Sequence, residues 1–204
     1  MLCALTLTLA LSQPAAAAGP LSLDVVNSTI SLSDPRWDTF SQRSSLGAWG
    51  LRGGYAVNSW LTGVVGWQYA EDGGWLWSDD SYDSDLRVAL VTNQVSIGPK
   101  FSLNVLSFLQ PYATVQAEAV LGRARLDDDP YHDDNLNQLR GGGVAFGGLA
   151  AGGVDLIARR VDKAVRPTLH VELGYAATTA LELDALGALE LRGFYSQWGV
   201  GARF

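Results

Sequence analysis

Few side chains in this chain are suited to acid–base chemistry, because the sequence contains only two histidines. His170 and Glu172 are separated by one residue, so both point the same way if this segment is a strand. A hydrolase needs a nucleophile beside such a base, and no serine neighbours His170 in sequence. His132 lies in an acidic segment. We therefore expect no enzyme, with a catalytic group assembled across strands as an alternative.

Two acidic segments are the other candidates for chemistry, in this case for binding a metal ion. Their weak candidate ligands are Asp79, Asp80, Asp83, Asp127, Asp128 and Asp129. Carboxylate oxygens suit Ca²⁺ or Mg²⁺. However, neither segment has the spacing of an EF-hand, with glycine at the sixth position and glutamate at the twelfth. We favour solvated loops over a metal site, and we expect no cofactor.

The composition limits the class of protein. Charged residues make up 17% of the chain, below the roughly 25% of an ordinary soluble domain, while the hydrophobic share is 48%. No window holds the roughly 20 apolar residues of a spanning helix. The net charge of −7 argues against a nucleic-acid partner, which requires a basic face. An apolar, glycine-rich chain without spanning helices predicts strands.

The first residues have the pattern of an export signal. An apolar run, Leu2–Leu11, is followed by the small residues Ala15–Ala18, although no Lys or Arg precedes the run. We expect residues 1–18 to be a signal peptide and residues 19–204 to be one domain. The only cysteine, Cys3, lies in that signal, so disulfides and thiolate chemistry are not expected in the mature chain.

Apolar and polar residues alternate with period two in several segments, most clearly around His170. The alternation predicts eight strands, at Leu21–Leu32, Leu46–Val57, Trp60–Ala70, Leu86–Phe101, Gln110–Gly122, Leu139–Leu156, Thr168–Ala177 and Phe194–Phe204. The sixth is dense in glycine, which indicates a bulge or a crowded wall. The connections between them alternate long and short throughout. That order predicts an all-β, eight-stranded, antiparallel up-and-down barrel with long loops at one end.

One face of these strands carries the ionisable side chains. If that face points inward, the lumen holds a polar network of Arg52, Glu118, His170 and Glu172, together with Lys100, Asp155 and Arg203. A barrel of eight strands is just wide enough for side chains to fill it. Buried charges must pair, so we favour a salt-bridged lumen over an open channel.

The sequence ends in Gly-Val-Gly-Ala-Arg-Phe, with Trp198, Val200 and Phe204 on one face of the last strand. With the export signal and the alternating loops, this ending resembles the small outer-membrane β-barrels of the OmpA-barrel and OmpX kind. The resemblance covers nearly the whole mature chain. It implies a transmembrane barrel in the outer membrane of a Gram-negative cell envelope, with these three residues acting as the signal for the barrel-assembly machinery. It also implies contact with outer-membrane lipids and lipopolysaccharide.

For the function we expect a structural or surface-binding barrel, monomeric, whose loops meet an extracellular ligand. One alternative is a small porin-like pore or transport barrel, and another is an enzyme that modifies lipid A. A fourth reading is a soluble lipocalin-like barrel that binds an apolar ligand, in which Trp49, Trp67 and Trp198 would face inward. Period two alone does not separate this inverted arrangement from the membrane barrel.

Overall fold

The computed structural model describes residues 21–35, 37, 44–76, 86–127, 140–158, 165–183 and 187–204. Eight strands make up nearly all of this part of the chain: β1 (Leu21–Leu32), β2 (Ser45–Ala56), β3 (Leu61–Leu76), β4 (Leu86–Ser102), β5 (Leu109–Asp127), β6 (Arg140–Ile157), β7 (Arg166–Glu182) and β8 (Ala188–Arg203). The expected signal peptide lies outside the described residues. No helix among the described residues has the length and apolar character needed to span a membrane.

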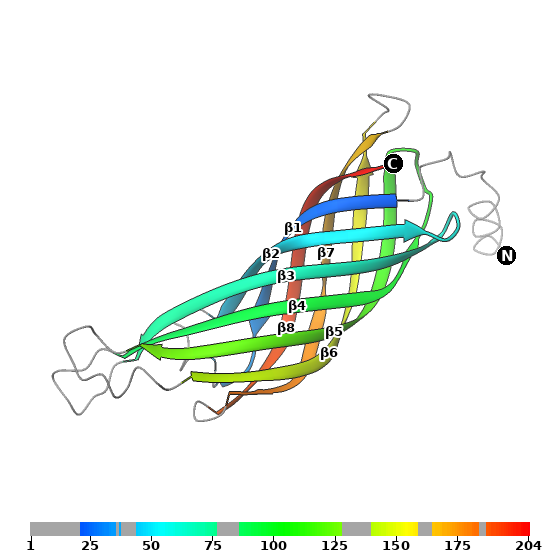
Figure 1. The fold of residues 1–204 in the computed structure, drawn as a ribbon. Helices are drawn as coiled ribbons and strands as arrows, with labels where there is room; N and C mark the ends of the chain where they lie inside the picture. The colour runs from blue at the N-terminus through cyan, green and yellow to red at the C-terminus, as the bar shows by residue number, and fades with distance from the viewer. Residues whose placement is uncertain are drawn as a thin grey trace.

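The strands form one closed, fully antiparallel barrel in chain order. The closing seam joins the first strand to the last, where Val25 of β1 is paired with Val200 of β8. The start of β1 and the C-terminus therefore lie at the same end, as Figure 1 shows. The short connections β2–β3, β4–β5 and β6–β7 lie at this end, which we call the turn end. The opposite end, the loop end, carries the longer connections β1–β2, β3–β4 and β5–β6. It also carries the β7–β8 connection, which is short at residues 183–187, so the predicted strict alternation of long and short connections is wrong at this last position. The predicted fold is confirmed.

Several strands are longer than the sequence pattern predicted. Strand β3 continues to Leu76, beyond the predicted end at Ala70, and Glu71–Leu76 pairs with β4 in regular register. Strand β7 continues to Glu182, beyond the predicted end at Ala177, after a register shift between Ala177 and Ala180. The reason is that ladder hydrogen bonds continue where the alternation of side chains weakens.

The outer face of the barrel is apolar. Its exposed large side chains include Val25, Trp49, Leu51, Tyr55, Val65, Trp67, Val95, Ile97, Val115, Leu121, Phe146, Val171, Leu173, Tyr175, Phe194, Trp198 and Val200. Trp49 and Trp198 are 55% and 54% exposed. The inverted, lipocalin-like arrangement is therefore wrong, because the tryptophans that it would place inside lie on the outer surface.

The interior has two layers. Toward the turn end it holds the polar and charged side chains described below. Toward the loop end it holds an apolar cluster, formed by Leu32, Trp37, Leu46, Ala48, Ala70, Leu90, Val120, Ala124, Ala145, Leu181, Leu183, Leu189 and Leu191. The lumen that the sequence predicted to be polar is thus polar in one half only.

The glycines of β6 make a crowded wall rather than a bulge. The described pairings of β6 with β5 and β7 run in regular register, and the one register shift lies in β7. A Cβ on Gly141 or Gly143 would lie 2.1 Å from the carbonyl oxygen of Leu183 or Glu182, respectively. Glycine at these two positions therefore lets the end of β7 pass close against β6.

Candidate functional site: the polar layer of the lumen

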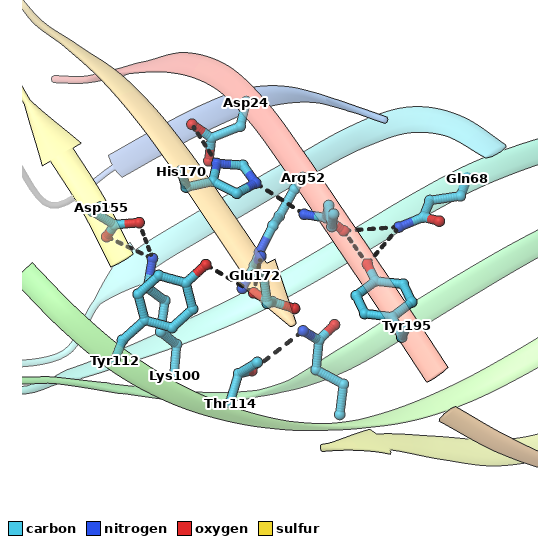
Figure 2. Close-up of polar contacts among 12 residues, drawn as sticks. Asp24, Arg52, Gln68, Lys100, Tyr112, Thr114, Asp155, His170, Glu172 and Tyr195 are labelled. Carbon is cyan, nitrogen blue, oxygen red and sulfur yellow. Dashed lines mark hydrogen bonds and ion pairs between the residues drawn. The ribbon is translucent and has the colours of Figure 1, made fainter. Parts of the chain in front are cut away.

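The centre of the polar layer is an ion pair that crosses the lumen. Arg52 on β2 donates from Nη1 to Oε2 of Glu172 on β7 over 2.8 Å, and the Tyr112 hydroxyl on β5 donates to the same oxygen over 2.9 Å. All three residues are buried. Figure 2 shows the three side chains converging from different parts of the wall. Alternation brings each side chain inward, and closure of the sheet places only β1 and β8 between β2 and β7.

A second charged group lies nearer the turn end. Lys100 Nζ contacts both carboxylate oxygens of Asp155, at 2.9 and 2.7 Å. Arg203 also donates to Asp155 and to Gln110 Oε1. The ammonium group of Lys100 lies 3.7 Å from the ring centroid of Tyr112, a cation–π contact that joins this group to the Arg52–Glu172 pair. Three strands are thereby cross-linked through a single carboxylate.

His170 is held in one protonation pattern by its neighbours. Its Nε2 lies 2.9 Å from Nε2 of Gln197, while Gln197 Oε1 accepts from Gln68 Nε2 at 3.1 Å and from the Tyr195 hydroxyl. Because an amide nitrogen only donates, His170 Nε2 accepts and the ring proton is on Nδ1. That side faces Asp24, whose Oδ1 lies 4.0 Å from Nδ1 and accepts from Thr168 Oγ1. The imidazole is a neutral link in this network.

Side chains of β1, β3 and β5 form the edge of the polar layer that is nearest the loop end. Ser28 donates to Gln68 Oε1 over 2.6 Å, and Gln116 donates to Thr114 Oγ1 over 3.2 Å. Glu118 is half-buried on the inner face of β5. The next inward residue toward the loop end, Val120, belongs to the apolar cluster. Glu118 therefore lies where the two layers meet.

The alternation of residues did not indicate the apolar layer, nor the tryptophan that belongs to it. Trp37 comes from the connection after β1, yet it is 1% exposed inside the apolar cluster. The segment is tied to β8, since Ser33 N donates to Arg192 O and Glu190 N donates to Asp34 Oδ2, both over 3.0 Å. A lone tryptophan in a polar segment was the signal for this contact. The leucine pairs Leu181–Leu183 and Leu189–Leu191 were the signal in the sequence for the other part of the apolar cluster.

This arrangement fits structural cohesion better than reaction chemistry. The contacts of His170 are made to Gln197 and Asp24, and neither offers a hydroxyl or thiol group that a histidine base would activate. Among the described residues no three His, Cys, Asp or Glu side chains are grouped as metal ligands. The side chains of the candidates Asp79, Asp80, Asp83, Asp127, Asp128 and Asp129 lie outside the described part. Trp198, Val200 and Phe204, the expected assembly signal, lie exposed on the outer face.

Comparisons with known proteins bear on the fold. No protein-family model matches the chain, and no curated protein matches it. Among solved structures, the outer membrane protein OprG from Pseudomonas aeruginosa matches with a TM-score of 0.52 at 12% identity, over 92% of this chain and 96% of that chain. Neisserial surface protein A matches with a TM-score of 0.42 at 14% identity, over 92% and 97%.

A third match is Ail, the attachment invasion locus protein of Yersinia pestis, in complex with the heparin analogue sucrose octasulfate. Its TM-score is 0.44 at 13% identity, over 90% of this chain and 94% of that chain. At these identities the likeness shows the fold alone. Of the three structures, OprG supports the fold assignment, because its TM-score is 0.52. With its eight antiparallel strands closed in chain order, the chain has the fold of the small outer-membrane β-barrels.

Proposed function

We propose that this protein is an integral outer-membrane barrel with a closed lumen, whose role is structural or surface-binding. The observation that carries the proposal is the inside-out distribution of charge. Arg52, Lys100, Asp155 and Glu172 are inside the barrel. By register, the outward positions of β5 from Leu109 to Leu121 carry no Asp, Glu, Lys or Arg. A water-soluble barrel would have the opposite distribution.

The height of this uncharged surface fits a bilayer. Leu109 and Leu121 are about 12 residues apart along β5, and a strand rises roughly 3.4 Å per residue. At a tilt of about 40° this run spans roughly 30 Å along the barrel axis, close to the thickness of the hydrocarbon core. In hydrocarbon every backbone amide must be paired, and the seam between β1 and β8 meets this requirement.

The two layers of the lumen support a closed barrel over a pore. Charged side chains cross-link the turn-end half, and the apolar cluster with Trp37 fills the loop-end half. A pore for water or ions needs a continuous polar path, and the apolar cluster interrupts it. Catalysis is also disfavoured, because the contacts of His170 include no serine, threonine or cysteine that it would activate. The loops at the loop end are then the parts available for a ligand outside the cell.

Quenching of tryptophan fluorescence by brominated lipids tests the orientation of the wall. Trp49, Trp67 and Trp198 are on the outer face, so vesicles of brominated lipid are expected to quench a large part of the emission. The variant Trp198→Phe is expected to lose part of the quenchable emission, whereas Trp37→Phe, changed inside the lumen, is expected to lose little of it. Emission that brominated lipid leaves unchanged would contradict a lipid-facing wall.

A further inference from the structure

A hollow of about 640 Å³ lies on the wall formed by β3, β4, β5 and β6 toward the loop end, where Figure 1 shows these strands side by side. Its lining is Tyr69, Glu71, Ala89, Val91, Arg123, Ala124, Gly141 and Gly142. Gly142 is paired with Arg123 across the β5–β6 ladder. The hollow exists because this stretch of β6 has no side chains to fill it.

The hollow lies at the upper edge of the apolar surface. Next to the hollow on the side of the turn end, the outward-facing residues are Leu121 on β5 and Val144 on β6, both 50% exposed. The next outward-facing residues of these two strands toward the loop end are Arg123 and Gly142. On β3 the outward-facing residue likewise changes from the aromatic Tyr69 to the charged Glu71. A molecule in this position would contact hydrocarbon-facing side chains below and charged side chains above.

Among the described lining residues the charged groups are one cation and one carboxylate, separated by strand β4. Glu71 is paired with Val91, and Val91 is paired with Arg123, so their backbones are about 10 Å apart at the spacing of strands. The Tyr69 hydroxyl donates to Glu71 Oε2 over 2.8 Å and fixes the carboxylate on this side. Arg123 is exposed. A guanidinium group binds phosphate through two parallel hydrogen bonds, and a carboxylate accepts from hydroxyl groups.

We propose that this hollow binds the phosphorylated sugar headgroup of a glycolipid in the outer leaflet, namely the lipid A part of lipopolysaccharide. Arg123 contacts the phosphate, Glu71 accepts from a sugar hydroxyl, and the acyl chains pack on Leu121 and Val144. The inference rests on the proposed outer-membrane location. The sequence predicted contact with outer-membrane lipids and lipopolysaccharide without naming residues, and this proposal gives that contact a defined site.

A second hollow on the opposite wall provides a contrast. It has a volume of about 610 Å³ and is lined by Ser33, Asp34, Pro35, Tyr175, Glu190 and Arg192. Its arginine donates to the Tyr175 hydroxyl over 3.0 Å, much as Tyr69 is joined to Glu71. However, two carboxylates accompany this arginine among the described lining residues, so this described lining is net negative and disfavours phosphate. Arg192 is therefore the matched control for Arg123.

Two kinds of substitution test the site. Arg123→Ala removes the phosphate ligand, and Arg192→Ala is its control. Gly142→Leu fills the hollow, and its Cβ is tolerated because the nearest atoms, Gly122 O and Arg123 Cγ, would lie at 3.5 and 3.7 Å. Gly152→Leu, on the same strand with its nearest atom at 3.8 Å, is the control for a bulky outward residue.

The measurement is native mass spectrometry of the purified, detergent-folded full chain with purified lipid A and with phosphatidylglycerol. The folded wild type is expected to bind lipid A in preference to phosphatidylglycerol. Arg123→Ala and Gly142→Leu are each expected to weaken lipid A binding at least about tenfold, the effect of losing one charge-assisted contact. Arg192→Ala and Gly152→Leu are expected to bind like the wild type.

The outcomes separate this site from the proposed function. Equal binding by wild type, Arg123→Ala and Gly142→Leu would overturn the site while leaving the outer-membrane barrel intact. No preference for lipid A over phosphatidylglycerol would overturn the sugar contact of Glu71, and with it the proposed ligand. A wild-type chain that fractionates away from the outer membrane would overturn the proposed function itself, and this is measured on the same preparation.

Discussion

Arg52 and Glu172 are 120 positions apart in sequence, yet they form a 2.8 Å ion pair across the lumen, between strands that are not neighbours in the sheet. The side chain of Glu172 is fully buried and that of Arg52 is 7% exposed. The pair thus links two strands that are separated by β1 and β8 in the closed sheet.

Removing one partner of this pair is expected to destabilise the barrel strongly. Arg52→Met leaves the Glu172 carboxylate buried with Tyr112 as its remaining donor, at a cost of about 3–5 kcal/mol in the free energy of unfolding. The double variant Arg52→Met with Glu172→Leu is expected to lose less than the sum of the two single changes. Urea unfolding in detergent micelles measures these values. Arg192→Met, on the outer surface, is the control and is expected to change little. Additive losses would contradict direct pairing.

Planar bilayers are expected to show no discrete conductance steps with the wild-type protein. The apolar cluster around Trp37 interrupts any polar path through the loop-end half of the lumen. Single-channel recording checks this expectation. Conductance that changes when Glu118 or Arg52 is neutralised would instead support the pore and contradict a closed lumen.

Three adjacent glycines of β6 are expected to differ in their tolerance of a methyl group. A Cβ on Gly141 or Gly143 would lie 2.1 Å from a backbone carbonyl oxygen at the end of β7. Gly141→Ala and Gly143→Ala are therefore each expected to lower the free energy of unfolding by about 1–3 kcal/mol. Gly142→Ala places its Cβ 3.5 Å from the nearest atom and is expected to be neutral. The folded fraction after refolding into detergent distinguishes them. Equal losses for all three variants would contradict the close approach of β7.

Overexpression is expected to leave the structure of lipid A unchanged. Among the described residues the contacts of His170 include no serine, threonine or cysteine, so this histidine has no hydroxyl or thiol partner to activate for acyl transfer or deacylation. Mass spectrometry of extracted lipid A, from cells with wild type and with His170→Ala, checks this expectation. A modification that appears with wild type and disappears with His170→Ala would show an enzyme.

The sequence pattern was sufficient for the fold, because period-two alternation and the order of long and short connections each depend on local residues. The ends of the strands were less predictable. Backbone pairing extends β3 to Leu76 and β7 to Glu182, past the point where side chains alternate clearly. Period two also left two orientations open, and only the closed register places Trp49 and Trp198 outside.

The contacts inside the lumen were beyond sequence reasoning. The alternation assigns Arg52, Lys100 and Glu172 to one face, but the partner of each depends on which strands lie opposite after closure. The sequence therefore did not indicate that Lys100 and Arg203 share Asp155. The position of Trp37 was missed for the same reason, since a residue in a connection has no periodicity that assigns it a side.

Cell fractionation combined with heat-modifiability tests the central claim most directly. The chain is expressed with an export signal, the outer membrane is extracted, and unboiled and boiled samples are run side by side on SDS gels. A closed barrel with a cross-linked lumen is expected in the outer-membrane fraction, with a mobility that changes on boiling. A soluble periplasmic band with the same mobility before and after boiling would contradict the membrane barrel.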